Sequence, residues 1–106
     1  MFPFALSEQQ KQGLTRISGP VAAAIELAMD DFRPRDIKPP RGATPDEVCM
    51  YQRHSFDVTT IPGTDGVLFV RFTLSPGACE QEGMILDAGA TYAVDVQGWR
   101  ILSVQK

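Results

Sequence analysis

The sequence predicts an α+β fold in which an N-terminal helix packs on one face of a four-stranded antiparallel meander. Two observations support this prediction. Apolar residues recur at helical spacing before residue 34, whereas the segments after residue 47 are rich in β-branched and aromatic residues and are separated by turn residues. The short connections favour antiparallel neighbours, and the one long helix is available to cover one face of the sheet. With 106 residues, we expect a single domain over 1–106.

The main helix is predicted from the stretch VAAAIELAMDDF, which follows Ser18-Gly19-Pro20. Ser18 is a suitable N-cap, and proline fits the first helical turn, where its missing N–H has no partner to lose. The apolar residues of this stretch form one stripe: Val21, Ile25, Ala28, Met29 and Phe32. Arg33-Pro34 is predicted to end the helix, because the residue before a proline is disfavoured in the α region.

Ser7 and Gln10 have capping-box spacing, so we also expect an earlier helical segment over 8–17. Helical structure would then extend over 8–33, with a break at Gly19-Pro20. The following residues, 34–47, are rich in proline, glycine and charge, which predicts an irregular connection to the sheet over 48–105.

Four segments have the composition of strands: 48–60, 67–74, 91–96 and 99–105. The turn residues IPGTDG join the first pair, and Gln97-Gly98 joins the last pair. In the central strand 67–74 the alternating pattern assigns one set of side chains to the core: Leu68, Val70, Phe72 and Leu74. The same counting assigns His54, Phe56 and Val58 to the core.

If Gln97-Gly98 is a two-residue hairpin loop, Val94 faces Ile101, Asp95 faces Arg100 and Ala93 faces Leu102. Trp99 then points toward the helix and is expected to close the core at its rim. The alternative is an exposed tryptophan that docks on a partner, since tryptophan is seldom wholly buried. On the opposite, open face of the sheet, arginines surround apolar residues: Arg53, Phe69, Arg71, Arg100 and Leu102. This face is either a partner surface or an apolar patch covered by arginine stems.

The composition argues against several function classes. Hydrophobic residues make up 43% and charged residues 22%, which is ordinary for a globular domain, and the net charge of −3 does not suit a nucleic-acid partner. No apolar run reaches the ~18 residues of a membrane span, and the N-terminus has no signal-peptide pattern. We therefore expect a cytoplasmic protein without a membrane or nucleic-acid partner.

Catalytic patterns are also missing from the sequence. His54 is the only histidine, and it is assigned to the core, which favours a structural role over a catalytic one. The spacing of cysteine, histidine and acidic residues does not match a zinc site, and no phosphate-binding or nucleophile-elbow motif occurs. We therefore expect no catalytic residue, no metal, no cofactor and no enzymatic activity.

Cys49 and Cys79 are expected near the same end of the first hairpin, because position 49 falls opposite about position 78 when 61–66 form the turn. A disulfide between them would close a loop of roughly 30 residues, worth on the order of 3 kcal/mol in the chain-entropy model. It would also favour a periplasmic or secreted protein whose signal peptide has been removed. The alternative is a pair of free thiols.

The segments AIELAMDDF and TYAVDVQGWRILSV give residues 20–105 a resemblance to the cystatin-like architecture. That group includes cystatins, minimal nuclear-transport-factor-2-like folds and small bacterial immunity or inhibitor proteins. In cystatins two hairpin loops form a wedge that blocks a protease cleft, and the Gly-Trp of this chain is similar to their Pro-Trp. The first loop, TTIPGTDG, lacks the cystatin Q-x-V-x-G signature, which argues against papain-like proteases as partners.

The expected function is that of a non-enzymatic protein-binding module, such as an inhibitor or a toxin-neutralising immunity protein. Its partner would dock either on the open face or on the loop residues: Pro62, Thr64, Asp65 and Trp99. One alternative is a small-ligand-binding or enzymatic domain of the nuclear-transport-factor-2 type, with a pocket near His54 and Tyr51. Another is a structural homodimer formed through the open faces.

Overall fold

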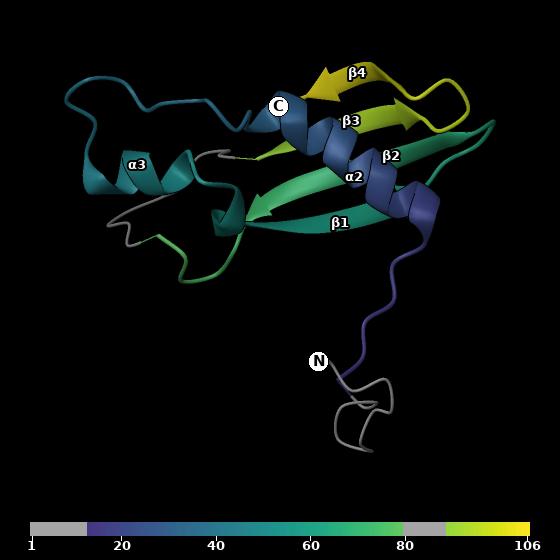
Figure 1. Cartoon of the computed structure of the whole chain (residues 1–106), viewed down its shortest axis with the longest axis horizontal. Helices are drawn as coiled ribbons and strands as arrows, with labels where there is room; N and C mark the ends of the chain where they lie inside the picture. Colours follow the sequence, from purple (N-terminus) through teal and green to yellow (C-terminus); the bar gives the residue numbers. More distant parts are fainter. Residues whose placement is uncertain (1–12, 80–88) are drawn as a thin grey trace, which may run out of the picture.

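The computed structural model describes residues 13–79 and 89–106, and in it one long helix lies across one face of a four-stranded antiparallel sheet (Figure 1). The strand order is β1-β2-β3-β4, so the sheet is a meander and the expected α+β fold class is confirmed. The elements are α2 (Gly19–Phe32), α3 (Pro45–Met50), the short 3₁₀ helix η1 (Arg53–Ser55), β1 (Phe56–Pro62), β2 (Val67–Leu74), β3 (Ala90–Asp95) and β4 (Arg100–Gln105).

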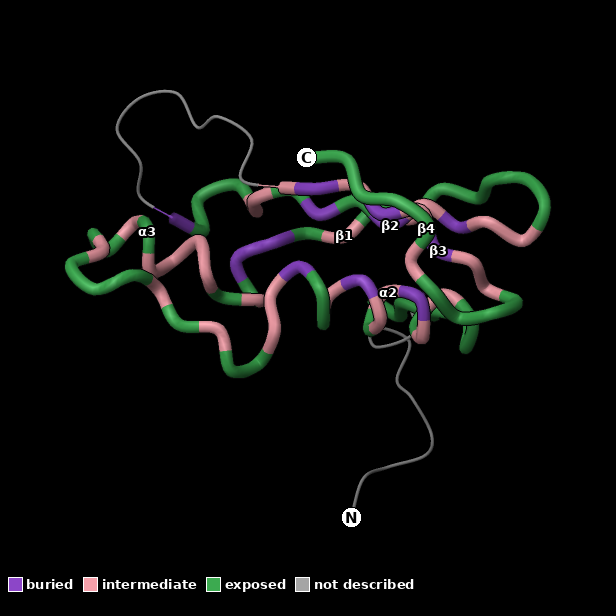
Figure 2. The backbone as a smooth tube through the Cα atoms, turned by 90° about the horizontal axis from the view of Figure 1, so that it is seen from above, coloured by how far each residue is buried: buried purple, intermediate pink, exposed green. Residues whose placement is uncertain are grey.

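Helix α2 forms where it was predicted, but its buried line differs in part from the predicted stripe, since Ala24 is buried and Val21, Ile25 and Met29 are only partly buried. Ser18 is its N-cap, and the Ser18 hydroxyl accepts a hydrogen bond from the Val21 N–H at 3.4 Å. Three residues spaced by four are buried on the face that meets the sheet: Ala24, Ala28 and Phe32. Two alanines let the helix approach the strands closely, because they add no side-chain bulk between the two layers. Figure 2 shows the buried segments of α2 and of the strands turned toward each other.

Phe32 is the centre of the core. Its ring stacks on Phe72 of β2, with ring centroids 4.6 Å apart, and meets the edge of Phe56 of β1 at 4.9 Å. Tyr92 of β3 packs edge-on against the same group, 5.8 Å from Phe72. One side chain of the helix therefore contacts three successive strands, which fixes where the C-terminal end of α2 lies on the sheet.

The expected helix over 8–17 is wrong for residues 13–17, which have no helical structure, and residues 8–12 lie outside the described part of the chain. Leu14 and Ile17 are 55% and 56% exposed. A capping pattern alone does not stabilise so short a helix, because most helical stability in proteins comes from the burial of an apolar face.

The expected first strand, 48–60, is wrong in its first half. Residues 45–50 form α3, whose N-terminus is a complete capping box in which Thr44 and Glu47 bind each other's backbone N–H. The strand begins only at Phe56, after η1. The β-branched and aromatic composition favoured a strand, whereas the Thr-Pro-Asp-Glu start is a helix signal that acts locally and prevails. His54 consequently lies in η1 and is exposed, not in the core as expected.

The central strand is confirmed. β2 covers Val67–Leu74 as expected. Of its four assigned core side chains, Leu68, Val70 and Phe72 are buried, and Leu74 is half-buried. The last hairpin is confirmed only near its loop, where Val94 pairs with Ile101 and Asp95 with Arg100.

Beyond those two pairs of the last hairpin, a β-bulge shifts the register. Ala93 pairs with Ser103, not with Leu102 as expected, and Tyr92 pairs with Val104. Leu102 is thus the extra residue of the bulge, two residues of β4 opposing one residue of β3.

Replacing the Phe32 side chain should reveal how much of the stability depends on this centre. We expect Phe32→Ala to lower the free energy of unfolding by about 3 to 5 kcal/mol, because it leaves a cavity beneath three aromatic rings. Urea unfolding followed by tyrosine and tryptophan fluorescence measures the change. The control Leu14→Ala, at an exposed position, should stay within about 0.5 kcal/mol of the wild type. A loss below about 1 kcal/mol for Phe32→Ala would contradict this role of Phe32.

Candidate functional site

Two loops lie side by side at one end of the sheet (Figure 1). The β1–β2 turn and the β3–β4 loop are joined by a hydrogen bond in which the Val96 N–H donates to the Gly66 carbonyl at 2.9 Å. They pack so closely that a Cβ at Gly66 would lie 3.0 Å from the side-chain nitrogen Nε2 of Gln97. We call residues 62–66 and 96–99 the loop end. Because of these contacts, the two loops form one surface and not two independent tips.

The loop end holds two residues with left-handed backbone. Asp65 has a φ of 57° and Trp99 a φ of 53°, and in the described part of the chain no other non-glycine residue has a positive φ. This conformation costs L-residues roughly 1 to 2 kcal/mol, and for a bulky side chain it is a clear outlier. Such strain persists where the surrounding structure enforces it, and it is concentrated at functional sites.

Trp99 is 43% exposed, so the expectation that it closes the core is wrong. The reason is the loop length. Residues 96–99 form a four-residue loop between paired Asp95 and Arg100, so Trp99 leaves the ladder and does not pair with Val96. The other expected loop residues, Pro62, Thr64 and Asp65, are exposed on the same end.

Asp95 holds the loop that carries Trp99. One carboxylate oxygen accepts the Gln97 N–H at 2.9 Å, and the other lies 3.5 Å from Nε of Arg100. The pKa of Asp95 is lowered, first because the backbone N–H groups of Gln97 and Gly98 donate to the carboxylate, and to a lesser degree because Arg100 is near. The charged form of Asp95 therefore orders the loop.

The open face contains three of the five residues expected there: Phe69, Arg71 and Arg100. Phe69 is half-buried, and Arg71 donates from Nε to the Thr91 hydroxyl at 3.2 Å. Arg100 is occupied by its pairing with Asp95. Leu102 is 49% exposed, but the bulge removes the pairing with Ala93 that assigned it to this face.

The expected position of Arg53 on the open face is wrong, because this residue belongs to η1. Its Nε donates to the Arg33 carbonyl and its Nη2 to Asp30, at 2.8 and 2.9 Å. Arg53 therefore ties η1 to the C-terminal end of α2.

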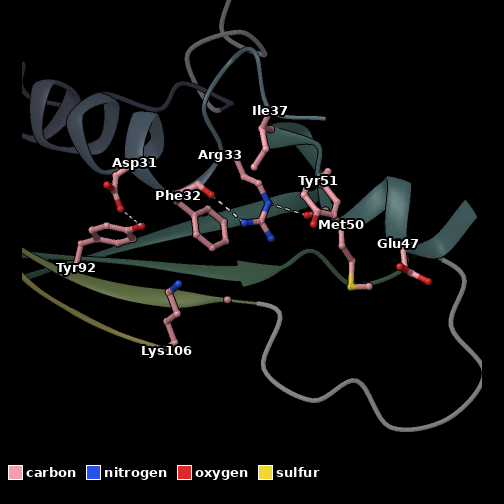
Figure 3. Close-up of a pocket in the computed structure, with 10 residues that line it drawn as sticks. Asp31, Phe32, Arg33, Ile37, Glu47, Met50, Tyr51, Tyr92 and Lys106 are labelled. Atoms are coloured by element: carbon pink, nitrogen blue, oxygen red, sulfur yellow. Dashed lines mark hydrogen bonds between the residues drawn. The ribbon is translucent and has the colours of Figure 1, made fainter. Parts of the chain in front are cut away.

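A cavity of about 600 Å³ opens beside that helix end (Figure 3). The helix end and the loop end lie at opposite ends of the sheet (Figure 1). Ten residues line it: Asp31, Phe32, Arg33, Ile37, Glu47, Met50, Tyr51, Gly89, Tyr92 and Lys106. Tyr51 was expected at a pocket, but His54 is not among the lining residues. The sequence did not single out Arg33 or Lys106 as site residues, because the end of α2 and the end of β4 meet only in three dimensions.

Cys49 and Cys79 form a disulfide, with Cα atoms 5.9 Å apart. Cys49 belongs to α3 and not to a strand, so the bridge attaches this helix to the segment that follows β2. Ser55 supports the attachment, since its hydroxyl donates to the Cys49 carbonyl at 2.8 Å and its carbonyl accepts the Ser75 N–H at the same distance.

In residues 13–79 and 89–106, no group of three or more histidine, cysteine, aspartate or glutamate side chains is arranged to hold a metal ion. The helices of the same residues are too short or too polar to cross a membrane. No protein-family model matches the chain, and no curated protein and no solved structure shows significant similarity to it.

Reduction of the disulfide should destabilise the protein. The bridge closes a loop with a sequence separation of 30 residues, for which the chain-entropy model gives about 3 to 4 kcal/mol. We expect a corresponding fall in the urea midpoint when a reducing agent is added. The double variant Cys49→Ser/Cys79→Ser serves as the control and should unfold like the reduced protein with or without the agent. Equal midpoints for the oxidised and reduced forms would be incompatible with a stabilising bridge.

Asp95 should make stability depend on pH in the acid range. Its folded-state pKa lies below the unfolded value of about 3.9, so its contribution is complete above about pH 4 and is lost as the pH falls through the folded pKa. We expect the stability advantage of the wild type over Asp95→Asn to shrink toward zero over that interval. Urea unfolding at a series of pH values measures it. An advantage that stays constant down to about pH 2 would show that the carboxylate charge is not responsible.

Proposed function

We propose that this chain is a non-enzymatic protein-binding module that inserts its loop end into a concave site on a protein partner, as an inhibitor or a toxin-neutralising immunity protein does. The observation that carries the proposal is the half-exposed Trp99 in a left-handed conformation, beside a second left-handed residue, Asp65, on the same end. The resemblance to cystatin-like inhibitors, which use the corresponding loops, is consistent with it.

Trp99 lowers the stability of the fold, because its backbone conformation is strained and its side chain does not pack in the core. Glycine adopts its conformation at no steric cost, and the indole is not among the buried core side chains. Tryptophan is enriched among the residues that dominate protein–protein affinity, because one ring buries roughly 150 to 250 Å². A binding role accounts for a tryptophan where the backbone favours glycine.

The loop end is also rigid before any partner arrives. Asp95 fixes the Gln97 N–H, and the bond from Val96 to Gly66 joins the two loops. A rigid loop loses little conformational entropy on binding, which favours affinity. The open face is less suited to this role, since Arg71 and Arg100 are occupied by contacts within the sheet.

The disulfide bears on where the partner is found. Stable disulfides belong to oxidising compartments, so the proposal places the protein in the periplasm or outside the cell, and no longer in the cytoplasm. The partner is then an extracytoplasmic enzyme or toxin.

Trp99→Gly tests the proposal, because it separates binding from folding. Relief of left-handed strain offsets the greater chain entropy of glycine in the unfolded state, so we expect stability within about 1 kcal/mol of the wild type. Binding of the partner should weaken by at least about 100-fold, as expected for the loss of a central tryptophan. The partner is isolated on the immobilised oxidised protein, and its affinity for each variant is measured by calorimetry.

Leu102→Ser is the matched control, because it removes an exposed apolar side chain from the bulge of β4 and leaves the loop end intact. It should bind like the wild type. If Trp99→Gly binds the isolated partner as tightly as the wild type does, the loop end is not the binding surface. Loss of binding in Leu102→Ser alone would assign the interaction to the bulge of β4.

A further inference from the structure

The cavity at the end of α2 surrounds an arginine whose position is fixed on two sides. The Arg33 Nε donates to the Met50 carbonyl and its Nη1 to the Phe32 carbonyl, each at 2.8 Å. The guanidinium carbon also lies 4.1 Å from the centre of the Phe32 ring, 5.0 Å from that of Phe56 and 5.6 Å from that of Tyr51. In Figure 3 the guanidinium stands among the lining side chains. The group is therefore held in place before any ligand binds.

Arg33 has no carboxylate partner in the described part of the chain. Both acceptors are neutral carbonyls, and within the same residues Nη2 makes no hydrogen bond. Burial lowers the pKa of Arg33, because the cation is partly removed from water. A partly desolvated guanidinium without an anion is stabilised by a bound carboxylate, which can accept a charge-assisted hydrogen bond from Nη2.

The other charges of the cavity limit the kind of anion. Lys106 adds a second cation that points toward Phe32 and Tyr92 (Figure 3). Asp31 accepts the Tyr92 hydroxyl at 2.8 Å, and Glu47 caps α3 through Thr44. Both acidic side chains are thus occupied within the fold. Arg33 and Lys106 can together hold one carboxylate, whereas Asp31 and Glu47 repel the second negative charge of a dianion such as phosphate.

The remaining walls are apolar or aromatic and come from different elements: Phe32, Ile37, Met50, Tyr51 and Tyr92. Small-molecule sites have the same combination of an apolar lining and a few polar groups, in cavities of about 300 to 1,000 Å³. The cavity of about 600 Å³ lies within that range.

We propose that this cavity binds a small monocarboxylic acid with an aromatic or apolar body. The carboxylate pairs with Nη2 of Arg33 and with Lys106, and the body lies against Tyr51 and Tyr92. The site is at the opposite end of the sheet from Trp99, so it is independent of the proposed protein-binding surface.

The test uses 3-phenylpropanoate as the probe and its neutral amide, 3-phenylpropanamide, as the matched control. Titration of the full oxidised chain is followed by NMR signals of the Arg33 side chain and the Tyr51 ring. We expect saturable shifts with a dissociation constant of about 1 mM or tighter for the acid, and at least about tenfold weaker binding for the amide. Inorganic phosphate should bind more weakly than the acid. Equal affinity for acid and amide, tighter binding of phosphate, or no saturable shift would overturn the proposal.

Two single-charge variants exclude a purely structural effect. Lys106→Gln removes a cation at an exposed position after the end of β4, so the free energy of unfolding should not change. Its affinity for the acid should fall by about three- to tenfold. Arg71→Gln removes one positive charge from the open face and should leave the affinity unchanged. If both variants weaken binding equally, the effect comes from net charge and not from this cavity. None of these outcomes alters the expectation for Trp99→Gly.

Discussion

The contact of Phe32 with Phe72, Phe56 and Tyr92 is the interaction on which the rest of the structure depends. It joins the last turn of α2 to three neighbouring strands, and aromatic pairs in these geometries contribute beyond their buried area. Since the next residue is Arg33, the same contact also sets where the guanidinium lies. The position of the C-terminal end of α2 therefore determines both the aromatic core and the place of Arg33 in the cavity.

The end of α2 needs this arrangement because its last carbonyls have no partners within the helix. Arg33 donates to the Phe32 carbonyl, and Arg53 donates to the carbonyl of Arg33. Two arginines thus replace the usual glycine-based C-cap and attach η1 to the helix. The disulfide adds a covalent attachment of α3 to the segment after β2. These links hold the segment after α2 beside the helix end, where Ile37, Met50 and Tyr51 line one side of the cavity.

The two ends of the sheet differ in how they hold functional side chains. At the loop end, hydrogen bonds from the loop backbone to Asp95 and Gly66 hold the loop that carries Trp99, and this residue is exposed in a strained left-handed conformation. At the helix end, partial burial beside aromatic rings reduces the contact of Arg33 with water. In our proposals the first end binds a macromolecule through its apolar surface, and the second binds a small anion through its cations.

The sequence by itself determined the helix stripe ending at Phe32, the central strand β2 and the pairing of Val94 with Ile101, because periodicity and turn residues act over short distances. It did not determine the helix at Pro45–Met50, where a local capping box overrode strand composition, nor the bulge at Leu102. Only the tertiary structure decided that Trp99 is exposed and that Arg33, Tyr51 and Lys106 share a cavity. These outcomes depend on loop length and on contacts between segments distant in sequence, which no local pattern encodes.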